Sequence, residues 1–310
     1  MNTKKLWIAF SLFVITAFSQ TSFAQGLNWE GQTGALLTPF AYTAGAPAGK
    51  LGKPEVAFHF LDAGNVLGNE YQFSVTEGIG KRFEVGFTQS FNEAGDTAGL
   101  SPLFVGGFSA IHGKYALVSE NSFKCKWVPA IAVGAIGRFG DSRVYTNALN
   151  NAAASLGNSS LTPTQNNGDF YIVATKTVTQ VKGLPFVLSI GDKLTDASIM
   201  GIAGQAGNGT NADVRWQGRL FGAAAFVVKG PAKSALIFGA EAVQEPHYVQ
   251  PLGNAATIPT SLSYFVRVVP HLEGSPLQVD LGLVQAAGHI APGVNLNADA
   301  RVGMGVSYHF

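Results

Sequence analysis

The chain has 310 residues, with 20 Lys and Arg against 19 Asp and Glu, a formal net charge of +1. Only 13% of its residues are charged, where about 25% is usual for a soluble globular protein, while Gly and Phe are abundant at 38 and 22. This composition argues against a disordered chain, which needs more charge and fewer aromatics, and against a nucleic-acid-binding protein, which needs a basic excess. It favours a membrane protein.

Residues 1–24 have the pattern of a secretory signal peptide. Lys4 and Lys5 precede an apolar stretch from Leu6 to Phe18, and small residues follow up to Ala24. The apolar stretch is too short to cross a membrane as a helix. We therefore expect cleavage after Ala24 and export of the mature chain. Its single cysteine, Cys125, has no partner within the chain for a disulfide.

Residues 25–53 form an N-terminal segment that differs in composition from the rest. It contains Gly31-Gln32-Thr33-Gly34, then Leu36-Leu37-Thr38-Pro39 and a run of small residues. With the strand-like Phe83–Phe87, this opening resembles that of exopolysaccharide-associated outer-membrane barrels, over roughly residues 31–91. The resemblance implies an accessory role in polysaccharide export or assembly. The residues themselves equally allow a periplasmic segment, one that enters the barrel lumen, or an extra strand.

Residues 54–310 alternate between large apolar and small or polar side chains with a period of two. Tyr71, Phe73 and Val75 illustrate the apolar set, which predicts strands with one lipid-facing side. The fold class is therefore all-β, a transmembrane antiparallel β-barrel of about 12 strands, with 10–14 as the accepted range. The strands are predicted near 54–62, 69–77, 82–91, 104–118, 127–139, 169–179, 184–193, 215–228, 234–244, 260–271, 276–286 and 298–310.

The connections alternate between short and long, as they do in outer-membrane barrels. Short turns such as Gly78-Ile79-Gly80 and Gly230-Pro231 define the periplasmic end. The long outer segments are 140–168, 194–214, 245–259 and 287–297. At the end of the chain, Tyr308 and Phe310 share one face. They resemble the terminal aromatic strand of bacterial outer-membrane proteins, which implies recognition by the barrel-insertion machinery.

Charged residues on the inward parity of these strands are the candidate functional residues. A Lys or Arg facing lipid at mid-bilayer costs roughly 2–4 kcal/mol, so the charges are expected to face the lumen. The set comprises Glu84, Lys114, Arg138, Lys193, Arg219, Glu241, Arg267, Asp280 and Arg301. Its excess of bases predicts a porin-like channel for small polar solutes with a mild preference for anions. The alternative is a sealed barrel in which the same residues pair across the lumen.

No catalytic motif or metal-ligand spacing is present in the sequence. We therefore expect no enzyme activity, no cofactor and no metal, although a barrel enzyme whose catalytic groups meet only in space remains an alternative. The expected partners are outer-membrane lipids, the insertion machinery and a small polar solute or a polysaccharide, with no nucleic acid. The expected location is the bacterial outer membrane.

Overall fold

The computed structural model describes most of the chain from residue 26 onward. The described residues are 26–96, 101, 105–140, 147, 161–162, 166–179, 181, 184–198, 201, 203–204, 207–208, 216–246, 260–270, 275–286, 289–291, 294–295 and 298–310. The predicted signal peptide, 1–24, and much of the predicted outer segments lie outside them.

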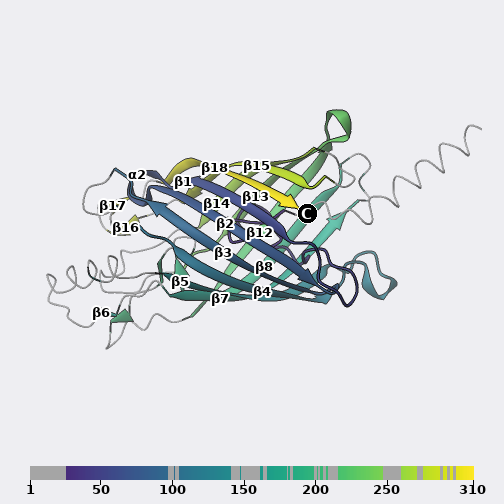
Figure 1. The fold of residues 1–310 in the computed structure, drawn as a ribbon, viewed down its shortest axis with the longest axis horizontal. Helices are drawn as coiled ribbons and strands as arrows, with labels where there is room; N and C mark the ends of the chain where they lie inside the picture. Colours follow the sequence, from purple (N-terminus) through teal and green to yellow (C-terminus); the bar gives the residue numbers. More distant parts are fainter. Residues whose placement is uncertain are drawn as a thin grey trace, which may run out of the picture.

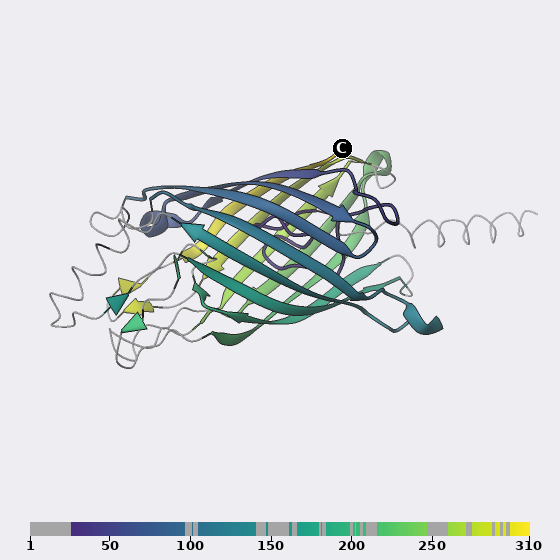
Figure 2. The ribbon, with the colours of Figure 1, turned by 60° about the horizontal axis from the view of Figure 1, so that its bottom comes forward.

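Twelve antiparallel strands form a closed barrel in which every strand pairs with its neighbours in the chain (Figures 1 and 2). The first and last strands close it, with Val56 opposite Tyr308. The strands are β1 (Glu55–Asp62), β2 (Asn69–Ile79), β3 (Phe83–Glu93), β4 (Phe108–Val118), β5 (Ala130–Gly140), β7 (Asn167–Val178), β8 (Phe186–Thr195), β12 (Gln217–Lys229), β13 (Ala235–Val243), β14 (Ser261–Val269), β15 (Leu277–Ala286) and β18 (Ala298–His309). The predicted fold class and strand count are confirmed.

The strand boundaries differ most from the prediction at two starts, and the other starts agree within two residues. β4 begins at Phe108 rather than 104, because Gly106 and Gly107 have positive φ and interrupt the extended backbone. β5 begins at Ala130 rather than 127, directly after Pro129, which has no backbone N–H to donate to a ladder.

The remaining elements are short and lie outside the barrel sheet. They are α2 (Gly64–Leu67), β6 (Leu161–Thr162), β9 (Ala197–Ser198), β10 (Ala203–Gly204), β11 (Gly207–Asn208), β16 (His289–Ala291), β17 (Val294–Asn295) and the 3₁₀ turns η2 (Ser122–Lys124) and η4 (Pro231–Lys233). Among the described residues, no helix is long and apolar enough to cross a membrane.

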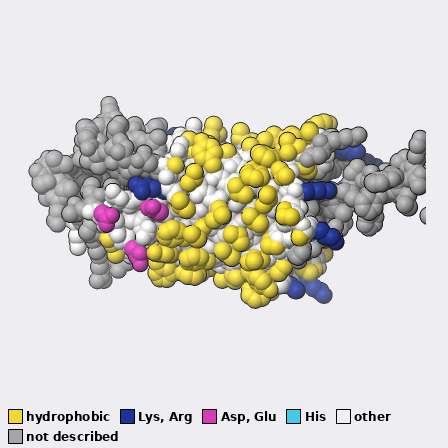
Figure 3. Space-filling view, turned by 90° about the horizontal axis from the view of Figure 1, so that it is seen from above, with side chains coloured by type: hydrophobic (Ala, Val, Ile, Leu, Met, Phe, Trp, Pro, Cys, Tyr) yellow, Lys and Arg dark blue, Asp and Glu magenta, His cyan; other side chains and the backbone are white. Residues whose placement is uncertain are grey.

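The outer surface of the barrel is an apolar band with charged groups towards its two ends (Figure 3). Large apolar side chains on the band, such as Phe87, Ile111 and Ile190, are about half exposed or more. Such a band is the lipid-facing surface of an outer-membrane barrel, so the chain is located in the outer membrane. Tyr308 and Phe310 also face outward and pack edge to face. Their role as an insertion signal stays a prediction.

The interior of the barrel is occupied by residues 26–44, which we call the lumen segment (Figure 2). Trp29, Leu36 and Phe40 of this segment are buried in one apolar cluster with wall residues that include Leu61 and Phe265. The core of the molecule therefore lies between the segment and the wall. It is not formed by wall side chains meeting across the barrel.

Candidate functional site in the barrel lumen

The lumen segment contains two consecutive turns, one closed by Leu27 and Thr33 and the next by Gly34 and Pro39. The side chain of Asn28 accepts hydrogen bonds from the backbone N–H groups of Glu30 and Gln32 at 3.1 and 2.8 Å, a local turn that Asn favours. A second turn brings Gly34 opposite Pro39. A Cβ on Gly34 would lie 2.2 Å from the Thr38 carbonyl oxygen, so only glycine fits there. The sequence thus forms a compact unit with outward-pointing backbone groups.

Glu241 and Arg267 hold this second turn from its two sides. The carboxylate of Glu241, on β13, accepts the backbone N–H groups of Leu36, Leu37 and Thr38 at 2.8–3.1 Å and the Thr38 hydroxyl at 2.7 Å. The guanidinium of Arg267, on β14, donates to the carbonyl oxygens of Gly34 and Ala35 at 2.9 and 3.1 Å. Hydrogen bonds to charged groups are the strong ones, worth about 1.5–3 kcal/mol each.

Arg267 is in turn paired with Asp280 of β15, which lies opposite it in the sheet register. Its Nε and Nη2 atoms donate to the two Asp280 carboxylate oxygens at 2.7 and 2.9 Å. Together with the two carbonyl contacts, this bidentate pair engages four of the five N–H donors of the buried Arg267, and the Asp280 carboxylate compensates its charge.

Glu84 and Lys114 hold the segment from the opposite side of the barrel wall. They face each other across β3 and β4, and the Lys114 Nζ lies 2.9 Å from the Glu84 Oε1. Glu84 accepts the backbone N–H groups of Thr33 and Ala44 at 3.1 and 2.7 Å, while Lys114 donates to the Thr33 carbonyl at 2.9 Å. Both side chains are buried.

Arg138, on β5, connects the first turn to the wall near the outer end of the strands. It donates to Glu30 of the lumen segment at 2.6 Å and to Asp169 of β7 at 2.7 Å. Burial raises the pKa of the Glu30 carboxyl, and the attraction of Arg138 opposes that rise. The Asn167 side chain accepts a further hydrogen bond from Arg138 at 2.9 Å.

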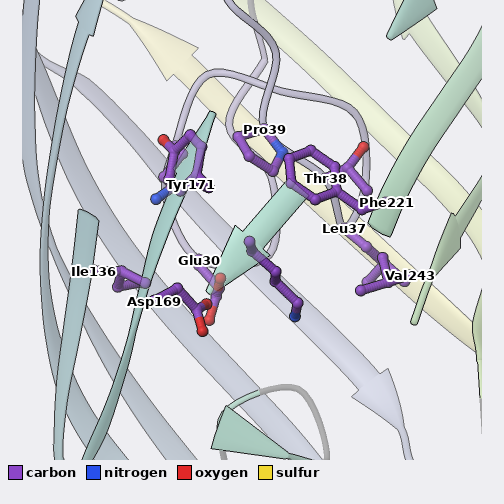
Figure 4. A pocket seen from close by; sticks show the side chains of 11 residues that line it. Glu30, Leu37, Thr38, Pro39, Ile136, Asp169, Tyr171, Phe221 and Val243 are labelled. Carbon is purple, nitrogen blue, oxygen red and sulfur yellow. The ribbon is translucent and has the colours of Figure 1, made fainter. Parts of the chain in front are cut away.

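Two adjoining cavities of about 40 Å³ each remain between the lumen segment and the wall. Both are lined by Glu30, Leu37, Lys193 and Val243. The inner cavity continues to Asp169, Tyr171 and Phe221 (Figure 4), and the outer one to Arg138, Glu245 and Ser261. A water molecule needs about 10–15 Å³ by this measure, so each cavity has room for about three waters.

The nine predicted lumen residues fall into three groups. Glu84, Lys114, Glu241, Arg267 and Asp280 are buried and hold the lumen segment directly or through one partner. Arg138 and Lys193 border the cavities. Arg219 and Arg301 are half-buried: Arg219 donates to the Glu245 carbonyl at 2.9 Å, and the Arg301 guanidinium lies 3.8 Å from the Asp62 carboxylate.

Sequence parity missed several interior acids. Glu55, Glu70, Asp169 and Glu245 are buried, and Glu30 enters the lumen from the N-terminal segment. These five join the three predicted acids, so acids outnumber the six bases in the interior. The signal for the strand residues was available, because Glu70 and Asp169 share the parity of the polar positions on their strands. The anion preference stays a prediction, and this charge balance weighs against it.

No protein-family model matches the chain, and no curated protein matches it. Solved structures do resemble it. The KdgM porin in complex with disordered oligogalacturonate is 9% identical and covers 83% of this chain and 99% of its own, with a TM-score of 0.45. The NanC porin is 9% identical and the match covers 83% of this chain and 100% of the porin, with a TM-score of 0.46. The COG4313 outer membrane channel from Pseudomonas putida F1 is 10% identical, covers 86% and 97%, and scores 0.49. At these identities no residue role passes from them to this chain.

Proposed function

We propose that the protein is an outer-membrane channel for small polar solutes, narrowed by the lumen segment. The observation that carries this proposal is the pair of adjoining, partly polar cavities that follow the wall beside the segment. Solutes enter from the outer end, where Glu245 and Ser261 line the first cavity, and continue towards Tyr171. The size of the cavities limits passage to solutes of a few non-hydrogen atoms.

The charges along this path support polar rather than apolar solutes. Lys193 and Glu30 border both cavities, with Arg138 and Asp169 beside them. An apolar solute would displace water from these groups without replacing its hydrogen bonds, which is unfavourable.

A sealed barrel is the second candidate, and the hydrogen bonds of Glu84, Glu241 and Arg267 favour it. They hold the lumen segment by its backbone at two separate places. In a sealed barrel the same contacts stabilise the fold and the two cavities hold only water. The polysaccharide role remains a prediction of the sequence resemblance, as does the absence of enzyme activity.

Liposome swelling distinguishes the two candidates. The mature protein, refolded into vesicles, is diluted into isotonic solutions of urea, glycerol or glucose. A channel of the proposed width gives fast swelling in urea and glycerol and slow swelling in glucose. Rates equal to those of protein-free vesicles for all three solutes would contradict the channel and favour the sealed barrel.

A further inference from the structure

The inner cavity contains two buried polar groups that have no hydrogen-bond partner within the described part of the chain. They are the hydroxyl of Tyr171, on β7, and the side-chain nitrogen of Gln32, in the lumen segment. Both residues line the cavity, and both are more than nine-tenths buried. Leaving a buried polar atom unpaired costs about 1–3 kcal/mol, so these groups need a partner, which water or a bound solute in the cavity can supply.

The position of Tyr171 is built into the wall. Its ring lies over Gly134 of β5, where a Cβ would come within 2.3 Å of the ring and the hydroxyl oxygen. Phe221 of β12 lies in the same way over Gly191, and the two rings meet edge to face with centroids 6.3 Å apart. The two aromatic side chains therefore lie along the wall, which leaves space in the lumen beside them.

The groups around this space match a neutral, hydrogen-bonding molecule. Gln32 supplies a donor, Tyr171 a hydroxyl that donates or accepts, and Asp169 a carboxylate that accepts. The charges of Lys193 and Arg138 balance those of Glu30 and Asp169, and Arg138 is paired directly with both acids, so the cavity has no strong net charge to hold an ion. Leu37, Ile136 and Phe221 add an apolar surface.

We propose that the two adjoining cavities form a binding site for small neutral polyols or amides, with Tyr171 and Gln32 as the groups that recognise them. The inference deepens the proposed function and rests on it, because it names the class of solute that the channel selects. Space for about six water molecules in the two cavities sets the upper size near glycerol, which has six non-hydrogen atoms. Glucose is too large.

The test compares glycerol with lactate, which has the same number of non-hydrogen atoms but a negative charge. In vesicles, glycerol flux should saturate with concentration and exceed lactate flux. Tyr171→Phe removes the hydroxyl. The glycerol concentration that gives half-maximal flux should therefore rise about fivefold, the effect of losing one hydrogen bond. Tyr115→Phe is the matched control, since Tyr115 faces outward from β4 and its hydroxyl has no place in the lumen.

A second measurement detects binding without transport. Trp29 lines the outer cavity and is buried. Trp127→Phe with Trp216→Phe leaves it as the single tryptophan of the mature chain. Its emission should change saturably with glycerol and not with glucose, and Tyr171→Phe should shift that titration by the same factor.

The outcomes separate the two proposals. If Trp29 emission changes saturably with glycerol but no glycerol flux is measured, the binding site is supported and the channel is contradicted. Glycerol flux that rises linearly and is unchanged by Tyr171→Phe, with no saturable Trp29 response, overturns the binding site and leaves the channel. Equal effects of Tyr171→Phe and Tyr115→Phe would also overturn it.

Discussion

Two regions of the lumen are built differently. In the first region, charged side chains of β3 and β4 and, on the opposite wall, of β13 and β14 hold the backbone of the lumen segment. Glu241 alone accepts three successive N–H groups. In the second region, beside β5, β7, β8 and β12, two cavities remain between the wall and the lumen segment. Lys193 borders both cavities and Tyr171 borders the inner one. The difference shows that inward charge does not by itself mark a permeation path: some of it anchors chain, and only the rest is left to meet a solute.

The largest effect is expected from a substitution that removes a hydrogen-bond acceptor from the anchored region. Glu241→Gln places a side-chain NH₂ group near backbone N–H groups that need an acceptor, and leaves some of them unpaired. We expect the free energy of unfolding to fall by about 3 kcal/mol, measured by urea unfolding of the refolded protein in lipid vesicles.

The control for that substitution is Glu93→Gln, at an exposed carboxylate that accepts a hydrogen bond from the Tyr71 hydroxyl at 3.1 Å. It should leave unfolding within about 0.5 kcal/mol of the wild type. Equal losses in the two variants would show that Glu241 does not anchor the lumen segment.

The cavity region is tested by a substitution that adds a methyl group beneath the Tyr171 ring. Gly134→Ala puts a Cβ within 2.3 Å of its ring, so the ring must move into the inner cavity, at a cost of about 1–3 kcal/mol. Glycerol flux should fall along with the unfolding free energy. Gly137→Ala on the same strand is the matched control, because its Cβ would meet the nearest atom at an ordinary 3.4 Å. Equal losses of glycerol flux and unfolding free energy in both variants would show that contact with the Tyr171 ring is not the cause.

Charge reversal at Lys193 tests whether the cavities carry the current. Lys193→Glu changes the charge by two units at a residue that borders both cavities. The ratio of cation to anion permeability should rise about fivefold, as expected for such a change a few ångströms from the path in a watery environment. The reversal potential under a salt gradient measures it. Lys233→Glu, on the exposed turn η4, should change the ratio little.

The smallest effect is a pH dependence from Glu245. Burial raises the pKa of this carboxyl, with Lys193 nearby opposing the rise, so Glu245 stays neutral to a higher pH than an ordinary Glu. Raising the pH through the pKa of Glu245 adds a negative charge to the outer cavity. The ratio of cation to anion permeability should then increase about twofold. Glu245→Gln should remove this step. A step that persists in the variant would belong to another group.

The sequence was sufficient for the barrel but not for its interior. Period-two alternation, as in Tyr71, Phe73 and Val75, predicts strands because each lipid-facing position must be apolar, and all twelve strands are found. It also gives parity, which points Arg267 and Glu241 inward. Parity does not say what an inward charge meets, because the Gly34–Thr38 turn is more than 200 residues away from both.

The residues of the cavity were harder to predict for a different reason. Tyr171 lies on the inward parity of β7, yet an inward aromatic is expected to fill a lumen. Only its pairing with Gly134, on the neighbouring strand β5, shows that the ring lies along the wall instead. Pairs of inward aromatics and glycines on neighbouring strands are therefore a signal to search for once the register is known.

The most direct test of the account is single-channel conductance of the mature protein beside a variant that lacks residues 26–44. If the lumen segment narrows the passage, the full chain gives small, stable steps and the shortened chain gives steps several times larger, with glucose now permeant. Heat-modifiable migration on gels verifies that the shortened barrel has folded. Equal conductance in the two folded proteins would contradict the central claim that this segment sets the width of the lumen.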